Sequence, residues 1–459
     1  MLDLKTKYAY DVEQIYTEAR MDPLSQFLSG FGQYPKHKSK LVRPTYASQI
    51  QLPDAQSILP RGYGKSYGDA AINADGVTLL TECLNRFITF DDVQGLLTLE
   101  AGCTLHDVLQ FALPRGWILP VMPGTAHVSV GGCIANDVHG KNHHHAGAFS
   151  ACVLSFELLT ANNDVITCSR EQHTDLFWAT IAGLGLTGII LRATLQLESC
   201  PSAYVSSQHL PTQDLQTTLA ALQNSALDDH YSIAWIDALA TGSSLGRGVY
   251  MRGHMADSEK DLPRAHSSRH LPSIFPNFCL NKPLGQLFNA IYREANGKKT
   301  RPFTQSYQQF FFPLDAIDNW PVLYGKCGMQ QYQFVVPEDG AESAIRDALT
   351  LLQKNNIPVY LATLKRLGNS NQSPLSFPMP GYTLALDVSM KHPNILDCFN
   401  QLDAIVMQHH GRVYLAKDAR LPQTAFKTMY PQWETWLDLK KQWDPAMKFR
   451  STLFSRIME

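Results

Sequence analysis

Apolar residues in the N-terminal part of the chain form short runs separated by turn residues, a pattern that predicts β-strands. The runs at 87–90 and 96–99 flank the polar sequence Asp-Asp-Val-Gln-Gly, which is typical of a β-hairpin. A second hairpin is predicted for 153–160 and 164–168, around an Asn-Asn turn. A glycine-rich stretch then leads into the β-rich run 189–197. We therefore expect strands that alternate with helices in this part.

Helices are predicted where a polar cap precedes an amphipathic stretch. Thr104 is placed to cap a helix that begins at the next residue, with Asp107 at the capping-box position. Two longer helices are predicted for 341–353 and 394–410, and Gly411 is placed to end the second. These helices alternate with strands, as in an α+β domain built on an antiparallel sheet.

A chain of 459 residues is too long for one compact core, so we expect two or three domains. The pattern breaks at Cys-Pro-Ser, after which aromatic residues and longer loops become more frequent. We place a first domain at 1–202 and a second, of α+β type, at 203–410. The segment 411–459 contains no core of its own size and must pack on an earlier part. The polar, charged stretch 255–268 is expected to be a mobile excursion.

Composition and charge narrow the class of protein. The chain is 44% hydrophobic and 17% charged with a net charge of −2, so it has no general attraction for nucleic acid. It contains no apolar run of about 18 residues and begins with no signal-peptide pattern. Nine cysteines without a Cys-x-x-Cys pair fit a reducing compartment. We expect a cytoplasmic protein, with peripheral contact at the inner membrane left open.

The stretch PRGYGKSYGD, residues 60–69, has the composition of a phosphate-binding loop but fails both familiar tests. A P-loop needs a glycine five positions before the one in Gly-Lys-Ser, and that position is Leu59. The dinucleotide fingerprint begins well with Gly62 and Gly64, but the third glycine, Gly68, comes one residue late. This loop is therefore of another kind.

A second segment, residues 123–140 (PGTAHVSVGGCIANDVHG), is also rich in glycine and other small residues. Such a composition lets the backbone approach a ligand closely. Together the two loops are suited to hold the two ends of one elongated phosphorylated ligand. Backbone N–H groups would bind a pyrophosphate, and small side chains would leave room for a planar ring.

With these loops, the chain resembles the FAD-binding domain of the vanillyl-alcohol-oxidase (PCMH-type) superfamily. The closer match is to the family of decaprenylphosphoryl-β-D-ribose 2′-oxidases, the flavoprotein half of a ribose-to-arabinose epimerase. The resemblance covers almost the whole chain, with only the first ~25 residues as an extension. It rests on the motifs RGYGKSYGDAA (61–71), HGKNHH (139–144), FWAT (177–180), GLTGII (185–190), QYQF (331–334), SFP (376–378) and YLAKD (414–418).

The resemblance implies an α+β, two-domain PCMH-type FAD-binding fold with an antiparallel-sheet substrate (cap) domain. In this family the first loop holds the FAD diphosphate without a Rossmann helix, and the chain from 411 onward completes the FAD-binding domain. Relatives with covalent flavin usually carry a histidine where this sequence has Lys65, so noncovalent FAD is expected. The implied FAD-binding residues are Arg61, Gly62, Tyr63, Gly64, Lys65, Ser66, Tyr67, Gly68, Asp69, Ala70, Gly124, Ser129, Val130, Gly131, Gly132, Asn136, Asp137, Val138, His139, Ile190 and Tyr414.

Lys417 is the first catalytic candidate. Removal of a hydride from a sugar carbinol carbon needs a group that accepts the hydroxyl proton. A lysine desolvated beside a flavin can act as that base, or can stay charged and stabilise the alkoxide. A surface lysine paired with Asp418 is the commoner arrangement, and the resemblance, in which this position is catalytic, favours the active-site role. Strand alternation would put Tyr414 and Ala416 on the face opposite to Lys417.

His139 and Tyr67 complete the catalytic candidates. His139 is placed to hydrogen-bond to flavin or substrate, whereas Tyr67 has packing in a turn as its alternative. A metal site formed by His139 with His143, His144 and His145 is a competing interpretation. Adjacent histidines in a strand point to opposite faces, and metal ligands need a fixed geometry. No metal is therefore expected.

The resemblance also implies a set of substrate-binding residues around the sugar and its phosphate: Lys141, Trp235, Gln331, Gln333, Lys365, Thr383 and Ala385. Tyr332 should point away from the two glutamines if this segment is a strand, and Trp235 alone is more often a core residue. Mycobacterial relatives have a cysteine at Ala385 and an asparagine at Thr383, and Phe311 replaces an expected tyrosine. These departures leave the exact substrate open.

The implied activity is FAD-dependent oxidation of a sugar hydroxyl, at C2 of a polyprenyl-phosphate-linked pentose, to a keto-sugar. A separate NAD(P)H-dependent short-chain reductase would then complete the epimerisation. Two alternatives stay open at this point: a soluble alditol or aldonolactone oxidase that uses oxygen, and a non-enzymatic flavin- or metal-binding protein. No nucleic-acid partner is expected.

Overall fold

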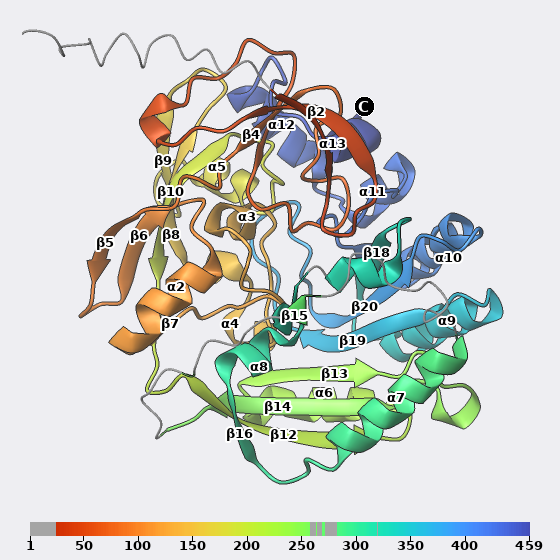
Figure 1. Cartoon of the computed structure of the whole chain (residues 1–459). Helices are drawn as coiled ribbons and strands as arrows, with labels where there is room; N and C mark the ends of the chain where they lie inside the picture. The colour runs from red at the N-terminus through yellow and green to blue at the C-terminus, as the bar shows by residue number, and fades with distance from the viewer. Residues whose placement is uncertain (1–23, 258–262, 264–268, 271–281, 319) are drawn as a thin grey trace, which may run out of the picture.

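The computed structural model describes residues 24–257, 263, 269–270, 282–318 and 320–459 (Figure 1). Helices and mainly antiparallel sheets make this an α+β protein. The predicted N-terminal extension lies outside these residues except for its last few positions, as does most of the excursion predicted at 255–268.

The N-terminal part contains two sheets, in the strand orders β1-β2-β4-β3 and β5-β6-β10-β8-β9. Both predicted hairpins are confirmed, since β5 pairs with β6 and β8 with β9 in antiparallel fashion. A short pair, β7 (Trp117–Ile118) with β11 (Glu198–Ser199), lies outside these sheets. The strands of the two sheets are β1 (Leu24–Ser29), β2 (Lys36–Val42), β3 (Ile58–Arg61), β4 (Val77–Leu80), β5 (Phe87–Asp91), β6 (Leu96–Glu100), β8 (Val153–Leu159), β9 (Val165–Ser169) and β10 (Ile189–Gln196).

The helices of this part are α2 (Leu105–Ala112), α3 (Val130–Ala135), α4 (His143–Ala146) and α5 (Thr174–Thr180). The predicted capping box is confirmed. The Thr104 N–H donates to Asp107 Oδ2 at 3.0 Å, and the Asp107 N–H donates to Thr104 Oγ1 at 3.1 Å. The adjacent histidines do not form a strand. They form the short helix α4, in which the Asn142 carbonyl accepts hydrogen bonds from the N–H groups of His145 and Ala146, both at 2.8 Å.

The second half is built on an eight-stranded sheet in the order β16-β12-β14-β13-β19-β20-β18-β21, with antiparallel pairing throughout. This confirms the predicted antiparallel α+β arrangement. Its strands are β12 (Tyr204–Thr212), β13 (Tyr231–Ile236), β14 (Gly248–Met255), β16 (Phe303–Ser306), β18 (Met329–Val336), β19 (Val359–Leu367), β20 (Gly381–Ser389) and β21 (Arg412–Val413). The remaining helices and strands here are α6 (Leu215–Asp228), α7 (Lys282–Gly297), α8 (Tyr307–Phe311), α9 (Ala341–Lys354), α10 (Ile395–Gln408) and the parallel pair β15 (Arg269–His270) and β17 (Ile317–Asp318).

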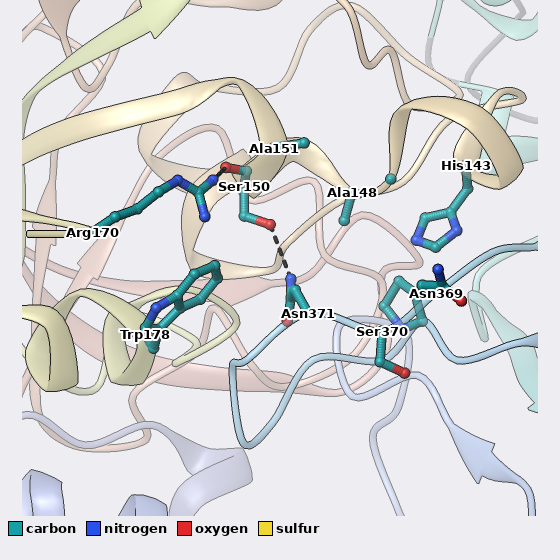
Figure 2. Close-up of a pocket in the computed structure, with 11 residues that line it drawn as sticks. His143, Ala148, Ser150, Ala151, Arg170, Trp178, Asn369, Ser370 and Asn371 are labelled. Carbon is teal, nitrogen blue, oxygen red and sulfur yellow. Dashed lines mark hydrogen bonds between the residues drawn. The ribbon is translucent and has the colours of Figure 1, made fainter.

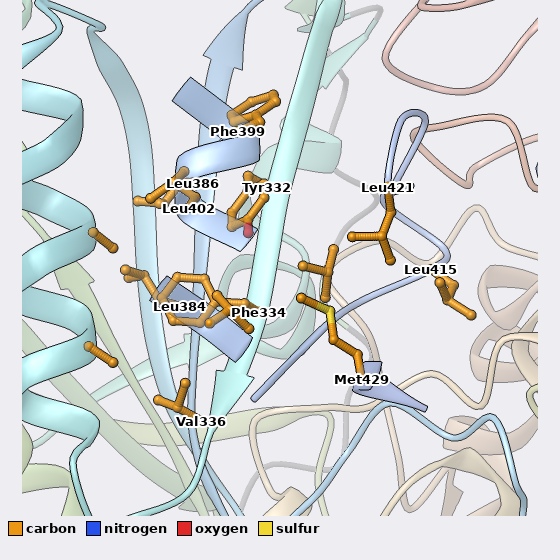
Figure 3. Packing of buried hydrophobic residues seen from close by; sticks show 14 of the residues in the cluster. Tyr332, Phe334, Val336, Leu384, Leu386, Phe399, Leu402, Leu415, Leu421 and Met429 are labelled. Atoms are coloured by element: carbon orange, nitrogen blue, oxygen red, sulfur yellow. The ribbon is translucent and has the colours of Figure 1, made fainter. Parts of the chain in front are cut away.

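Strand alternation divides this sheet into two faces of different chemistry. On one face, Phe334, Leu384 and Leu386 pack towards α10 (Figure 3). Tyr332 lies on the same face, where its hydroxyl donates to Asp403 Oδ1 at 2.8 Å, so the predicted orientation of Tyr332 is confirmed. Burial of each large apolar side chain contributes about 1.5–3 kcal/mol. This face holds the core, and the other face is free to carry polar residues.

The C-terminal segment continues through α11 (Gln423–Met429), α12 (Trp433–Trp443) and α13 (Thr452–Met458). Helix α12 contacts α5 of the N-terminal part, and α11 contacts both α10 and α13 (Figure 1). The Trp436 indole N–H donates to the Ala179 carbonyl at 2.8 Å, and the Ile58 N–H donates to the Lys448 carbonyl at 2.7 Å. The end of the chain therefore packs on segments that lie far earlier in the sequence, around residues 58 and 179.

Two local predictions are wrong. Residues 414–418 form a turn instead of a strand, because the Lys417 N–H donates to the Tyr414 carbonyl at 2.9 Å, so strand alternation does not apply there. Helix α10 ends at Gln408, two residues earlier than predicted, and the left-handed residue after it is His410, with a φ of 53°, instead of Gly411. Gly411 still takes part in ending the helix, because its N–H donates to the Val406 carbonyl at 2.8 Å.

Among the residues that the structure describes, no helix is long and apolar enough to cross a bilayer. All eight cysteines in this part of the chain are free thiols.

Candidate active site

Most of the predicted substrate-binding residues lie on the polar face of the eight-stranded sheet, which is the face opposite to the hydrophobic core. Gln331 lies opposite Asp387 in the strand register, Gln333 lies opposite Ala385, and Lys365 lies opposite Thr383. Directly opposed residues share a face of the sheet. Five strand positions on β18 and β20 and one on β19 therefore present their side chains together, away from the hydrophobic core.

His139 connects this face to the second glycine-rich loop. Its Nε2 lies 3.0 Å from the Gln333 side-chain amide, and its Nδ1 lies 3.3 Å from Lys365 Nζ. The Gln333 amide also donates to Thr383 Oγ1 at 3.1 Å. Burial, together with the charge of Lys365, holds the pKa of His139 well below its usual value. His139 is therefore a neutral hydrogen-bonding group at neutral pH.

Lys417 lies near the group formed by His139, Gln333 and Lys365. Its Nζ is 3.8 Å from the centre of the Tyr67 ring. Burial lowers the pKa of Lys417 to about 7, the charge of Lys365 acts in the same direction, and Asp387 opposes the shift. The first loop is tied to this turn by the Tyr67 N–H, which donates to the Ala416 carbonyl at 3.0 Å. At neutral pH a substantial fraction of Lys417 is an uncharged amine, which is the form that accepts a proton.

Two further lysines reach the same region. Burial lowers the pKa of Lys141 to about 7 and that of Lys365 to about 8. The Lys141 ammonium donates to the Phe310 carbonyl and lies 4.4 Å from the centre of the Phe310 ring. An anion bound between these lysines would favour their charged forms. The region is therefore suited to a phosphate group.

Asp387 is a site residue that the sequence analysis missed. Its side chain is fully buried, and Oδ1 accepts from Gln331 Nε2 at 2.6 Å. Oδ2 has no hydrogen-bond partner within the described residues, and burial raises the pKa of Asp387 to about 7. The signal that could have identified it is a carboxylate at the end of the apolar run YTLAL in β20.

The two glycine-rich loops form a cradle of small residues with free backbone donors. Within the described part of the chain, the N–H groups of residues 63–66 have no hydrogen-bond partner. A Cβ added at Gly124 would meet no atom within 4 Å, whereas Gly62 already packs against Ser129. The buried side-chain oxygen of Asn136 likewise lacks a partner among the described residues. This arrangement can bind an elongated anionic ligand.

Comparison with known proteins identifies that ligand. The family model for an FAD binding domain matches residues 49–169, and that for D-arabinono-1,4-lactone oxidase matches residues 300–457. Decaprenylphosphoryl-β-D-ribose oxidase of Mycolicibacterium smegmatis is 37% identical over 420 residues, which cover 88% of this chain and 89% of the relative. The chain belongs to the decaprenylphosphoryl-β-D-ribose oxidase family. Like that family, it is an FAD-dependent oxidoreductase.

More distant relatives extend the same superfamily. L-gulonolactone oxidase of Bos taurus is 22% identical, with 86% of this chain and 88% of the relative covered. L-gulono-1,4-lactone dehydrogenase of Mycobacterium tuberculosis is also 22% identical, with 92% and 96% covered. Both names describe oxidation of sugar lactones.

The cradle fits the FAD of this family. Free N–H groups in the first loop suit a diphosphate, and the open space at Gly124 and the unpartnered Asn136 oxygen leave room and polarity in the second. Ser129 caps α3 by accepting from the Gly132 N–H at 3.2 Å, so Val130, Gly131 and Gly132 start that helix beside the cradle.

Three predicted FAD-binding side chains have partners inside the protein. The Arg61 guanidinium donates to the carbonyls of Ser29 and Ala71, and Asp69 holds Arg456 at 2.9 and 3.0 Å. Asp137 accepts hydrogen bonds from the Ser376 hydroxyl, the Asn371 amide and the Ser150 N–H. These side chains therefore help to shape the two loops.

The other predicted FAD-binding residues differ in their contacts and in their exposure to solvent. Gly68 packs directly against the turn at 414–418, since a Cβ added at Gly68 would lie 1.6 Å from the Asp418 carbonyl oxygen. The Tyr414 hydroxyl donates to the Asn136 carbonyl at 2.8 Å, and its ring stacks on Phe377 at 4.5 Å. Ala70 and Ile190 are buried, Val138 and Lys65 are partly exposed, and Tyr63 is 38% exposed.

Trp235 lies on β13, on the same face as the polar network, opposite Thr363 of β19. Its ring is 4% exposed and packs on Tyr292 of α7 at 4.7 Å. Trp235 is thus held between the sheet and a helix.

A cavity of about 320 Å³ lies beside this site (Figure 2). Arg170 donates to the Ser150 carbonyl at its edge, and Asn371 donates to the Ser150 hydroxyl. None of the predicted catalytic residues lines it. Among the described residues, no group of three or more His, Cys, Asp or Glu side chains is arranged to hold a metal ion.

Proposed function

We propose that the chain oxidises a hydroxyl group of a polyprenyl-phosphate-linked pentose, at C2, to a keto-sugar. The name of the Mycolicibacterium smegmatis relative supports the substrate class. The observation that carries the proposal is the convergence of His139, Lys365 and Lys417 beside the cradle for FAD.

FAD, when bound, supplies the acceptor for a hydride from the carbinol carbon. Lys417 takes the hydroxyl proton in its uncharged form, which its lowered pKa of about 7 makes available. His139 orients the substrate as a neutral hydrogen-bonding group, held by Gln333 and Lys365. Tyr67 packs beneath Lys417 and keeps its proton, because burial raises the pKa of Tyr67 well above its usual value.

Lys141 and Lys365 bind the substrate phosphate in this proposal. Burial lowers the pKa values of both lysines because it removes water from their ammonium groups. A bound anion would stabilise these charged groups. Gln331, Gln333, Thr383 and Ala385 surround the sugar. Trp235 closes the far side of this face.

The proposed division of the chain follows its sheets except at β21, which pairs with β18 of the eight-stranded sheet. Residues 1–202 and 411–459 form the FAD-binding domain, and 203–410 form the substrate domain, supported by the contacts of Trp436 and Lys448 with the N-terminal part. FAD is held noncovalently, because Lys65 occupies the position of the linking histidine. The keto-sugar product passes to an NAD(P)H-dependent short-chain reductase, and the chain works in the cytoplasm at the inner membrane.

The test is anaerobic bleaching of the FAD-loaded protein by a polyprenyl-phosphoryl pentose. We expect the parent to bleach, and Lys417→Ala to retain FAD without bleaching. Bleaching of Lys417→Ala at the parent rate would remove Lys417 from the mechanism. A parent protein that keeps its colour with every such sugar would refute the proposed substrate.

A second candidate is an oxidase of free sugar lactones or alditols. It is favoured by the match of residues 300–457 to the D-arabinono-1,4-lactone oxidase model. Turnover of aldonolactones with release of hydrogen peroxide, and none with the phosphorylated lipid, would select this function.

A further inference from the structure

Helix α7 exposes an apolar stripe. Leu287, Phe288 and Ile291 are 57%, 57% and 60% exposed, and Leu284 is 43% exposed. Their spacing of i, i+3, i+4 and i+7 puts them on one side of the helix. In a globular protein such a stripe normally faces the core. Here it is the largest group of exposed apolar side chains on any helix in the described part of the chain.

Specific contacts hold the helix in this orientation. Asn289 is buried and donates to Asp237 Oδ1 at 2.7 Å, and Tyr292 packs on Trp235. Gly285 faces Leu239, where an added Cβ would come within 3.0 Å. These residues share a different side of α7, which lies across β12 and β14 at the outside of the molecule (Figure 1). A rotation that buried the apolar stripe would break each of these contacts.

A basic cluster follows the helix directly. Lys298, Lys299 and Arg301 line a cavity of about 430 Å³ with Thr300, Pro302 and Phe303. All three basic residues are exposed, and Lys298 also pairs with Glu294 at 3.0 Å. Lys282, at the other end of α7, is exposed as well. The apolar stripe is thus flanked by positive charge at both ends.

We propose that α7 and the basic cluster form a docking surface for a bilayer that carries anionic headgroups. Leu287, Phe288 and Ile291 would enter the boundary between headgroups and acyl chains, while Lys298, Lys299 and Arg301 contact lipid phosphates. An apolar stripe with flanking lysines is the composition that binds such an interface. A second copy of the chain fits less well, because two antiparallel copies of α7 would bring basic ends together.

Docking through α7 would bring the candidate site to the lipid, since Tyr292 joins this helix to Trp235 on the polar face of the sheet. The inference does not depend on the proposed substrate. Vesicle binding is measured without any sugar, so its outcome and that of the bleaching experiment are independent.

The experiment is flotation of the full FAD-loaded chain with vesicles of equal parts phosphatidylcholine and phosphatidylglycerol, and with phosphatidylcholine alone. We expect binding to the anionic vesicles to fall about tenfold or more in Leu287→Gln/Ile291→Gln. Lys298→Glu/Lys299→Glu should lose roughly fivefold for each lysine removed at low salt. Phe27→Gln/Val93→Gln removes two side chains that are 75% and 84% exposed elsewhere, and should bind like the parent.

Equal FAD content and equal melting temperatures establish that each variant is folded. Parent-like binding by Leu287→Gln/Ile291→Gln would overturn the proposal. So would a parent dimer that dissociates in this variant, because the stripe would then be an interface between copies. Binding that ignores phosphatidylglycerol would overturn the role of the basic cluster.

Discussion

The protonation state of Lys417 determines how the rate of flavin reduction depends on pH. Burial lowers the pKa of this side chain from 10.5 to about 7. Below pH 7 the neutral fraction of such a group falls about tenfold for each pH unit, so the reduction rate should rise about tenfold between pH 6 and 8. Lys417→Arg keeps a positive charge throughout this range and should lose a factor of about 10² to 10⁴.

The assay is anaerobic stopped-flow reduction, followed by the visible flavin absorbance at saturating substrate. Lys427→Arg is the matched control, because Lys427 also lies over an aromatic ring, 4.5 Å from the centre of Trp433, but outside the site. A parent rate that is flat between pH 6 and 8, or a Lys417→Arg variant as fast as the parent, would refute the role of the neutral amine. A rate that falls with rising pH would assign the charged lysine to alkoxide stabilisation.

Other perturbations test the fold, the cradle and the sugar pocket. Lys440→Met leaves a buried carboxylate without its partner and should lower the free energy of unfolding in urea by about 3–5 kcal/mol, whereas Lys441→Met, at an exposed ion pair, should change it by under about 0.5 kcal/mol. Gly68→Ala should release FAD on gel filtration, because its Cβ would collide with a backbone carbonyl 1.6 Å away. Gly124→Val should keep the parent melting temperature of the FAD-free protein, because a Cβ there meets no protein atom within 4 Å, yet should weaken FAD binding in a fluorescence titration by occupying part of the cradle. Acid precipitation and filtration should release all the yellow colour, and colour that stays with the protein would mean a covalent link. Nitroaromatic inhibitors directed at a cysteine should add no mass to this chain, which has Ala385 at that position.

Patterns that depend on neighbours in the chain were predictable from the sequence. The two hairpins and the capping box at Thr104 follow from residues a few positions apart. The orientation of Tyr332 followed from the period of a strand. The FAD-binding loops were recognisable because several motifs occur in a fixed order, although each loop alone resembles an incomplete nucleotide-binding motif.

The tertiary structure decided which distant groups meet. The sequence contains Asp387 and Lys417 thirty positions apart, but only strand register and the turn at 414–418 set their electrostatic coupling. The lowered pKa values of Lys141, Lys365 and Lys417 arise from burial, which depends on side chains contributed by many segments. The same holds for α7, an amphipathic helix for which the sequence analysis made no prediction. The other side of α7 contacts the sheet, for example through Asn289 and Asp237, so the apolar stripe faces solvent. The orientation of a helix depends on all the residues that pack against it and not on its periodicity alone.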